Sequence, residues 1–319
     1  MEGQAKIKVM GIGDAGNNII NRMIQEKVKY VSFIEVNTDK TALKLSKTKN
    51  IIQIGKETTK GLGCGSDVSR GERAAKESKE EIKKYLQDTD MLFLTTGMGG
   101  GAGTGAIQVI AQIARDMGIL TVGIVTMPFS FEGKKRVLVA KQAIEELRNH
   151  IDALIIISND RLIDIAEDHT TIKSAFKIAD EILKRGIQSI TDLITKTGEI
   201  NIDFADVKTI MGYKGGAYMG IGRAEGEKGI IKAVKRAIDN KLTEIKIDGA
   251  KGVIINFEGG SNLGLSQIND SLQIINDRIS PDANIIFGTT LNENLRDRVK
   301  VTIIATGIEK EEEENINNQ

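Results

Sequence analysis

The chain has 319 residues, enough for two domains of ordinary size, and its 44 basic and 44 acidic residues give a formal net charge of zero. The lack of a broad basic field, with 4% aromatic residues and no Trp, argues against nucleic-acid binding. Cys64 stands alone, so no disulfide forms within the chain and a reducing compartment is favoured. Neither His150 nor His169 has the neighbours of a metal ligand. We find no signal peptide and no bilayer-spanning apolar run, and expect a cytoplasmic protein without direct membrane insertion.

Strand-like and helix-like segments alternate through the first half of the chain. Mostly continuous apolar runs predict strands at 7–12, 31–36, 51–54, 91–96, 120–126 and 153–158. Helical periodicity is found between them, at 17–26, 66–86, 105–116 and 132–147. This alternation predicts an α/β fold with a doubly wound parallel sheet, in which ligands bind beyond the carboxyl ends of the strands.

Two glycine-rich loops follow predicted strands. The first, Gly11–Gly16, reads G-x-G-x-x-G with Glu35 about 20 residues further on, which alone is typical of a dinucleotide site. The second, Gly97–Gly105, has no role in a dehydrogenase. Consecutive glycines let backbone N–H groups turn toward an anion, and a following helix adds a favourable dipole. Two such loops predict a phosphate chain held from two sides.

The second half begins with a long helical pattern over 171–195, after which a second domain opens near Gly212. That domain reads as strand, helix, strand, helix and two strands, at 215–224, 228–240, 252–257, 265–277, 283–289 and 299–305. This order predicts a mixed four-stranded sheet covered by helices, hence a second α+β domain. The predicted parts are 1–170, a central segment 171–211, 212–308, and an acidic disordered tail 309–319.

Residues 6–308 resemble the tubulin/FtsZ family of GTPases. The resemblance is carried by motifs in order along the chain: Gly11–Asn18, Gly99–Gly105, Pro128–Arg136, Asn159–Leu162 and Asn201–Asp206. It implies a cytoskeletal protein that binds and hydrolyses GTP, polymerises head-to-tail and forms the cell-division ring at the division site. It also implies GTP or GDP as ligand, with Mg²⁺ or alternatively K⁺. Implied partners are the chain itself and division regulators.

The same resemblance implies which residues meet the nucleotide. They are Gly13, Asp14, Ala15, Gly16, Asn17, Asn18, Gly97, Gly99, Gly100, Gly101, Ala102, Gly103, Thr104, Gly105, Pro128, Glu132, Arg136, Asn159, Phe176 and Asp180. The resemblance also implies that Asn201, Asp203 and Asp206 are the catalytic residues and that they act on the nucleotide of the next subunit. The active site would then exist only in a polymer.

Some of these residues have a chemical rationale of their own. Asp180 follows Phe176 by one helical turn, so a carboxylate that accepts from guanine N1–H and N2–H₂ would lie beside an aromatic ring. The alternative is a solvated helix surface and a core ring. Asn18 and Asn159 are amide candidates for base or ribose, or alternatively helix caps. Glu132 and Arg136 could instead form a surface ion pair, and Asp206 could cap a short helix.

Three departures from the family pattern bear on turnover. Ala102 stands where the family usually has Thr, Asp14 and Ala15 replace glycines, and Met127 replaces a common Arg. They keep open a weakly hydrolysing assembly paralogue, while an NAD-dependent oxidoreductase would leave the second glycine loop unexplained. The tail after 309 lacks the family's apolar-basic peptide for membrane tethers, which implies a shortened chain or a different mode of recruitment.

Overall fold

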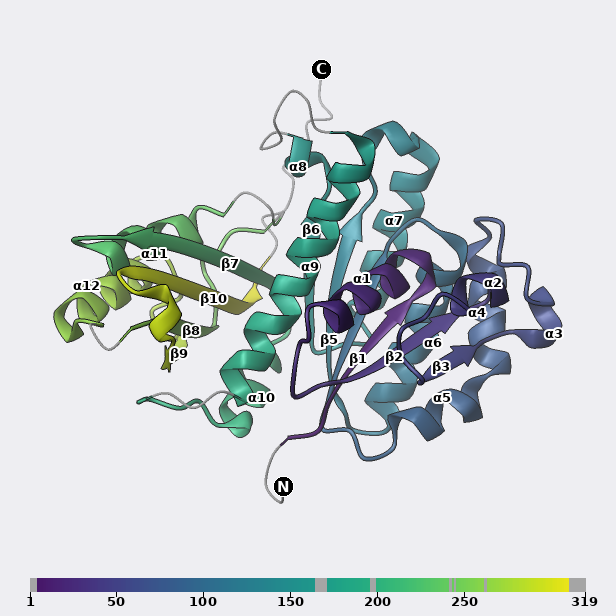
Figure 1. The fold of residues 1–319 in the computed structure, drawn as a ribbon, viewed down its shortest axis with the longest axis horizontal. Helices are drawn as coiled ribbons and strands as arrows, with labels where there is room; N and C mark the ends of the chain where they lie inside the picture. The colour runs from purple at the N-terminus through teal and green to yellow at the C-terminus, as the bar shows by residue number, and fades with distance from the viewer. Residues whose placement is uncertain are drawn as a thin grey trace. The chain divides into compact units, whose positions relative to one another are not determined.

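The computed structural model describes residues 5–163, 171–195, 199–240, 243, 245–260 and 263–309. Two compact units are found (Figure 1). The first comprises Met1–Thr197, Asn201–Phe204 and Lys241–Glu244, and the second Gly198–Ile200, Ala205–Asn240 and Ile245–Gln319. None of the helices in the described ranges is both long and apolar enough to cross a membrane.

The first unit is built on a parallel sheet with the order β3-β2-β1-β4-β5-β6. Its strands are β1 (Ile7–Ile12), β2 (Ser32–Asn37), β3 (Ile51–Gln53), β4 (Met91–Gly97), β5 (Leu120–Met127) and β6 (Ala153–Ser158). The reversal between β1 and β4 is the switch point of a doubly wound sheet, where ligands bind. The predicted strands and fold class of this half are confirmed.

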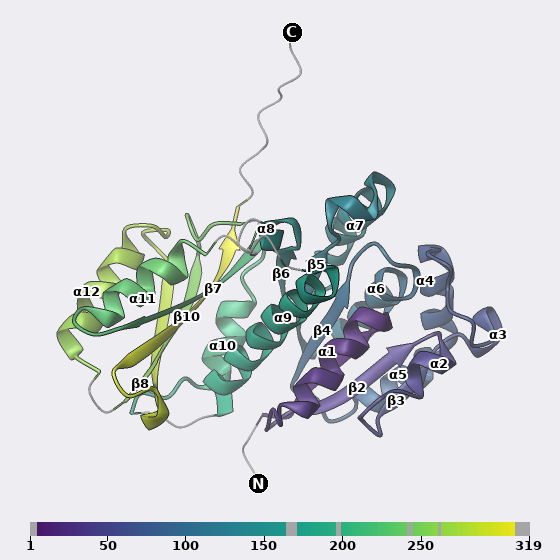
Figure 2. The ribbon, with the colours of Figure 1, turned by 45° about the horizontal axis from the view of Figure 1, so that its top comes forward.

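Helices cover both faces of this sheet, as Figure 2 shows. α1 (Gly13–Gln25) lies against β1 and β2 and packs on α9 (Ile172–Thr195). The other face buries the main apolar core beneath α4 (Val68–Glu77), α5 (Lys79–Leu86), α6 (Gly101–Asp116) and α7 (Lys134–Leu147). Short helices α2 (Lys40–Leu43), α3 (Lys56–Thr59) and α8 (Asp160–Ile163) lie in the connections.

The predicted helix over 66–86 is wrong in one respect, because it is two helices that meet at Ser78. The Ser78 hydroxyl accepts from the Gly55 N–H at 3.0 Å, and its backbone leaves helical geometry at φ −97° and ψ 16°. Beside it, the Glu77 carboxylate accepts from the backbone N–H groups of Glu57 and Thr58 at 3.0 Å each. The start of α3 thus donates three backbone hydrogen bonds to side chains at the junction between α4 and α5.

Helix starts also differ from the predictions. α1 and α6 begin inside the glycine segments, at Gly13 and Gly101, and not after them. The segment predicted over 132–147 is a short 3₁₀ turn η1 (Ser130–Glu132) followed by α7, with Gly133 between them at φ 108°. Glycine is a weak helix former, which is why the periodicity placed the starts of α1 and α6 too late, whereas α7 begins two residues later than predicted.

The second unit has the predicted mixed four-stranded sheet, with the order β7-β10-β8-β9. β10 runs antiparallel to β7 and β8, while β8 and β9 are parallel. The elements are α10 (Phe204–Met211), β7 (Gly216–Glu225), α11 (Gly229–Ile238), β8 (Gly252–Gly259), α12 (Leu265–Asn276), β9 (Asn284–Leu291), η2 (Glu293–Leu295) and β10 (Arg298–Ile308). α11 and α12 cover its apolar core. The predicted tail, from residue 310 on, lies outside the described residues.

Candidate phosphate and base site

A pocket of about 330 Å³ opens at the carboxyl ends of β1, β2 and β4. Its lining comes from the starts of α1 and α6, the ends of these strands, the segment that precedes α4, and one arginine of α7. These residues are Gly13, Asp14, Ala15, Asn37, Thr38, Asp39, Gly63, Cys64, Gly65, Ser66, Thr96, Gly97, Gly100, Gly101, Ala102, Gly103 and Arg136. The two predicted glycine segments therefore meet at one pocket.

The chemistry of this pocket is that of an anion site. The first backbone N–H groups of a helix have no partner within it, and two helices begin here, with Gly100 at the N-cap of α6. Gly13 adopts φ 70°, and a Cβ added to it would lie 3.1 Å from the backbone nitrogen of Gly103, so the segments are in close contact. Two helix dipoles thus present positive ends to one small space, which suits phosphate.

Other glycines of the predicted set serve packing. A Cβ at Gly103 would lie 2.2 Å from Thr96 Oγ1, and one at Gly105 would lie 2.1 Å from the carbonyl oxygen of Val68 on α4. A threonine side chain at Gly103 and the backbone of α4 at Gly105 therefore leave no room for a Cβ. Gly100 differs, since an added Cβ meets nothing within 4 Å, which leaves its face open toward the pocket.

α4 and α6 also interlock through their backbones. A Cβ at Gly71 would lie 2.2 Å from the carbonyl oxygen of Gly101, and one at Gly101 would lie 2.7 Å from Cβ of Cys64. Of the remaining glycine-segment candidates, Gly16 lies against the carbonyl oxygen of Thr95, with 2.6 Å to an added Cβ. Gly16, Asn17, Asn18, Gly99, Thr104 and Gly105 are outside the pocket lining.

The segment from Gly97 to Thr104 is closed by a side chain. The hydroxyl of Thr104 accepts from the Gly99 N–H at 2.8 Å. Gly99 has φ 93°, and its added Cβ would lie 2.9 Å from the carbonyl oxygen of Arg136. These contacts hold the start of α7 against the glycine segment, and this brings Arg136 into the lining.

The alternative interpretation of Glu132 and Arg136 as an ion pair is seen, with 3.0 Å between Oε2 and Nη1, although Glu132 is mostly enclosed and does not lie on the surface. The other carboxylate oxygen of Glu132 accepts from the Phe129 N–H at 2.9 Å. Both oxygens of Glu132 are therefore engaged, one by Arg136 and the other by the Phe129 N–H, and the ribose contact of Glu132 stays a prediction. Pro128, directly after β5, is buried.

Three phenylalanines cluster beyond the end of β5. Phe129 is fully buried, stacks on Phe131 with ring centres 4.8 Å apart, and meets Phe176 of α9 edge-on at 5.2 Å. Phe131 is 58% exposed and Phe176 40%. Sequence reasoning had singled out only Phe176. The cluster supplies two half-open aromatic faces on which a planar base could lie.

Asp180, one turn beyond Phe176 on α9, is mostly enclosed, with 23% of its side chain exposed. Burial raises its pKa to about 6, and the nearby Arg22 guanidinium opposes this rise. The alternative of a solvated surface carboxylate is therefore wrong. An ionised carboxylate in such surroundings is a strong hydrogen-bond acceptor.

Asn159 directly follows β6 and is buried, and its Oδ1 has no hydrogen-bond partner within the described ranges. The alternative role as a helix cap is thus not seen, and an unpaired acceptor beyond a strand end is open to a ligand donor. Asn18 is exposed on α1, whereas its neighbour Asn17 is buried with both amide atoms unpaired among the described residues.

Sequence reasoning missed the part of the pocket lining that is formed by the last residue of β2 and the two residues after it, 37–39. Asn37 Nδ2 donates to Asp14 Oδ1 at 2.9 Å, and the Asp39 N–H donates to Asn37 Oδ1 at 3.1 Å. Three polar residues, 37–39, directly follow a predicted buried strand, and this pattern could have indicated that they belong to the site. The alternating glycines at 61, 63 and 65 were another, and they lead into Ser66, whose φ is 66°. Strained backbone of this kind clusters at functional sites.

Glu35 cannot serve as the ribose-binding acid of a dinucleotide site. It lies within β2, opposite Gly11 of β1, and is completely buried outside the pocket lining. Burial raises the pKa of its carboxyl, and nearby Ser46 and Asn17 offset that rise only in part. The G-x-G-x-x-G segment therefore lacks the second half of its usual fingerprint.

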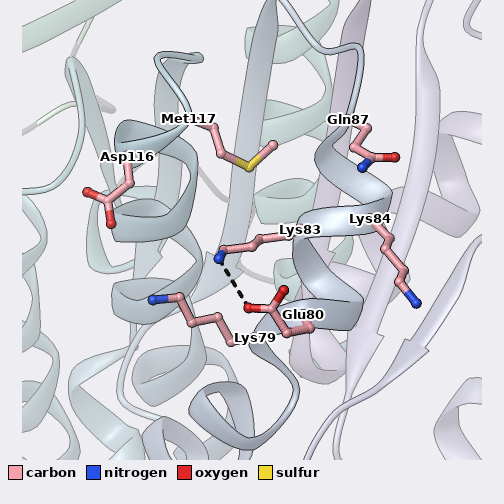
Figure 3. Close-up of a pocket in the computed structure, with 7 residues that line it drawn as sticks. All are labelled: Lys79, Glu80, Lys83, Lys84, Gln87, Asp116 and Met117. Carbon is pink, nitrogen blue, oxygen red and sulfur yellow. Dashed lines mark hydrogen bonds and ion pairs between the residues drawn. The ribbon is translucent and has the colours of Figure 1, made fainter.

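A larger pocket, of about 480 Å³, lies elsewhere, between α5 and the end of α6 (Figure 3). It is lined by Lys79, Glu80, Lys83, Lys84, Gln87, Asp116 and Met117. Lys83 pairs with Glu80 at 3.1 Å. These residues precede β4 and β5, at the edge of the sheet where the strands begin. Long, mostly exposed side chains line this pocket, so the smaller glycine-lined pocket is the better candidate despite its size.

The three predicted catalytic residues are not in the lining of the glycine-lined pocket. Asp203 directly precedes α10, and Asp206 lies in its first turn and not at the cap. Asn201 lies two residues before Asp203. Among the described residues, no group of three or more His, Cys, Asp or Glu is arranged to hold a metal ion.

Comparisons with known proteins agree with this fold. The sequence model of the tubulin/FtsZ family, GTPase domain, matches residues 6–167, and that of the FtsZ family, C-terminal domain, matches 215–309. An empty FtsZ dimer from M. jannaschii is 43% identical, with a TM-score of 0.89 over 96% of this chain and 89% of that one. A CetZ protein of Haloferax volcanii, solved as a GTPγS-bound protofilament, is 19% identical, with a TM-score of 0.83 over 96% and 94%. This second likeness concerns the fold alone.

Proposed function

The chain belongs to the tubulin/FtsZ family, and on that premise we propose that it binds GTP and hydrolyses it within head-to-tail filaments of its own copies. The observation that carries the proposal is the pocket where α1 and α6 both begin. The unpaired N–H groups of two helices, with the Arg136 guanidinium, suit a chain of phosphates. The open face of Gly100 leaves room for the phosphates to approach the backbone.

The base would lie outside the glycine-lined pocket, against Phe131 or Phe176, since neither ring belongs to the pocket lining. Asp180 would accept from guanine N1–H and N2–H₂, and the unpaired Oδ1 of Asn159 would accept a further donor of the nucleotide. Adenine lacks the paired donors and would leave the carboxylate poorly satisfied. A site built on such hydrogen bonds discriminates by roughly 10⁴ or more.

Hydrolysis would need a second copy of the chain. The pocket lining includes none of Asn201, Asp203 and Asp206, and the assignment of these residues to the neighbouring subunit's nucleotide follows from membership of the family. There the carboxylates would orient a water toward the γ-phosphate, because the protein's part in phosphoryl transfer is mainly positioning and electrostatics. The donor chemistry also fits Mg²⁺, since the carboxylates of Asp14 and Asp39 line the pocket. Such an ion, when bound, would neutralise phosphate charge.

A role as the cell-division ring protein, with cytoplasmic localisation at the division site and contacts to division regulators, is supported by the 43% identity to FtsZ. A second candidate is a weakly hydrolysing assembly paralogue. It is favoured by Ala102, a pocket-lining residue that offers no hydroxyl, and by the extra charge of Asp14. Turnover per assembled subunit separates the two candidates, and the position of a fluorescently tagged chain in dividing cells tests the ring.

Sedimentation and phosphate release, measured on the same samples with GTP and with ATP over a range of protein concentrations, test the main proposal. We expect GTP-specific pelleting and turnover that appears above a critical concentration, because isolated subunits lack the neighbour's carboxylates. Constant specific activity down to high dilution would contradict the shared site. Equal response to ATP would contradict the assignment of the base site.

A further inference from the structure

Arg22, near the end of α1, has no part in the function proposed above. Its Nη1 donates to the carbonyl oxygen of Lys177 at 2.7 Å and lies 4.0 Å from Asp180 Oδ2. Lys177 and Asp180 are three residues apart and share one side of α9. A backbone acceptor thus holds the guanidinium where its charge acts on the Asp180 carboxylate.

The other charged groups where α1 meets α9 are engaged elsewhere. Glu26, the C-cap residue of α1, pairs with the buried Lys184, which also contacts Glu181 at 2.7 Å. Glu26 also lies 3.8 Å from the Nε of Arg22, and the side chain of Lys177 is exposed. Lys184 is therefore shared between two carboxylates and is not a counter-ion for Asp180.

The remaining elements against α9 offer Asp180 no substitute. α8 carries Asp160, whose carboxylate accepts from the Ser130 N–H at 2.8 Å, and Arg161, which has interactions of its own. β5 has no titratable side chain. Within the described part of the chain, Arg22 is the cation that opposes the effect of burial on the pKa of Asp180.

Resting on the guanine-binding role proposed for Asp180, we propose that Arg22 is a positioning residue for base recognition. It keeps the Asp180 carboxylate ionised and oriented, so that both oxygens can accept from the guanine N–H groups. A protonated Asp180 would carry an O–H donor toward those donors, and one acceptor would be lost. Arg22 acts through Asp180 and needs no contact with the nucleotide.

The test is the pH dependence of GDP binding, measured by calorimetry from pH 5.5 to 9 on the full chain. The diphosphate avoids hydrolysis. For the parent we expect constant affinity at high pH and a fall of about tenfold per pH unit below a midpoint near the Asp180 pKa of about 6. Arg22→Gln should move that midpoint to higher pH. The GDP affinity of Arg22→Gln should approach the parent's at pH 9. Below both midpoints, it should be lower than the parent's by about tenfold for each pH unit by which the midpoint has moved.

Two further variants distinguish an effect of the Arg22 charge from an effect on the packing of α1 against α9. Arg22→Lys keeps a cation and should restore a midpoint close to the parent's. Arg185→Gln is a matched control, since Arg185 pairs with Glu181 at 2.7 Å on the outer side of α9 and has no contact with Asp180 among the contacts described. It should reproduce the parent profile. Circular dichroism at each pH confirms that all variants are folded.

Each other outcome has a definite meaning. A loss of GDP affinity in Arg22→Gln that is the same at every pH would show that Arg22 only clamps α1 to α9, and would overturn the inference. A parent that prefers GDP to ADP but has no midpoint in this range would also overturn it, while leaving the proposed function in place. A parent that binds GDP and ADP alike, or neither, would instead contradict the proposed function.

Discussion

Replacing Asp180 by asparagine should stabilise the free protein while it weakens guanine binding. Burial raises the pKa of Asp180 from its ordinary value of 3.8 to about 6, a difference worth about 3 kcal/mol of folding free energy at about 1.4 kcal/mol per pKa unit. Because the folded pKa is the higher one, the cost is absent below about pH 4, grows as pH rises, and is complete above about pH 6. The neutral amide of the variant would carry no such cost. The 23% exposure of the side chain makes the full 3 kcal/mol an upper value.

Urea unfolding of the nucleotide-free protein, followed by circular dichroism at pH 8 and at pH 5, measures this effect. We expect Asp180→Asn to exceed the parent by about 1–3 kcal/mol at pH 8 and by clearly less at pH 5. Its GDP affinity should fall by about 2–3 kcal/mol, because a charged acceptor becomes a neutral amide that also presents donors. The exposed Asp116→Asn is a control without effect on either quantity. A variant equal to or weaker than the parent at pH 8, or an advantage that does not change with pH, would refute the reasoning.

Three further predictions concern the phosphate end and its partner. Gly100→Ala should fold with little loss of stability, because its Cβ meets nothing within 4 Å, but it should bind GTP more weakly. Gly103→Ala should unfold at a lower urea concentration, because its Cβ would lie 2.2 Å from a threonine hydroxyl. Asp203→Ala and Asp206→Ala should each bind GTP but lose turnover. Mixing either variant with Gly100→Ala should restore some phosphate release where the two kinds of subunit meet. If the two proteins co-sediment and no phosphate release is restored, this would count against catalysis in trans. Ala102→Thr should tighten GTP binding or raise turnover by roughly threefold to a hundredfold in total, since a hydroxyl donor to a charged group contributes about 1.5–3 kcal/mol; a fall in both would show a site repacked around Ala102.

The elements that sequence reasoning predicted well are those whose pattern is local. Continuous apolar runs mark the buried strands β1 to β6, and the 3.6-residue period over 171–195 marks α9, because burial on one or both faces is written into neighbouring residues. The break at Ser78 could not be predicted in this way. It depends on the Gly55 N–H, 23 residues away in sequence. The mixed four-stranded sheet of the second unit followed from the type and order of its elements, which admit few arrangements, but the order of its strands was not predicted.

The candidate site likewise has some features that the sequence predicted and others that depend on contacts distant in sequence. That both glycine segments would meet at one pocket followed from their position after parallel strands. Which glycines face the pocket did not, because Gly105 is excluded by contact with α4 and Gly100 is open only through the absence of a neighbour. The raised pKa of Asp180 depends on its burial and on Arg22, a residue 158 positions earlier. No local sequence pattern in α9 indicates this raised pKa.

The interlocked backbones of α4 and α6 determine where this pocket can be re-engineered. A chemist who wants a GTP analogue that only an altered copy accepts must remove atoms from the protein to admit a bulkier ligand, and Gly101 of the pocket lining has no side-chain atoms left to remove. Nor can Gly101 be moved outward, because α4 packs directly behind it: a Cβ added at Gly71 would lie 2.2 Å from the Gly101 carbonyl oxygen. The opposite strategy, a substituted pocket matched to a trimmed phosphate analogue, can begin at Gly100, where the protein has space to give. Selective ligands for this chain are therefore more readily designed by shortening the nucleotide than by enlarging it.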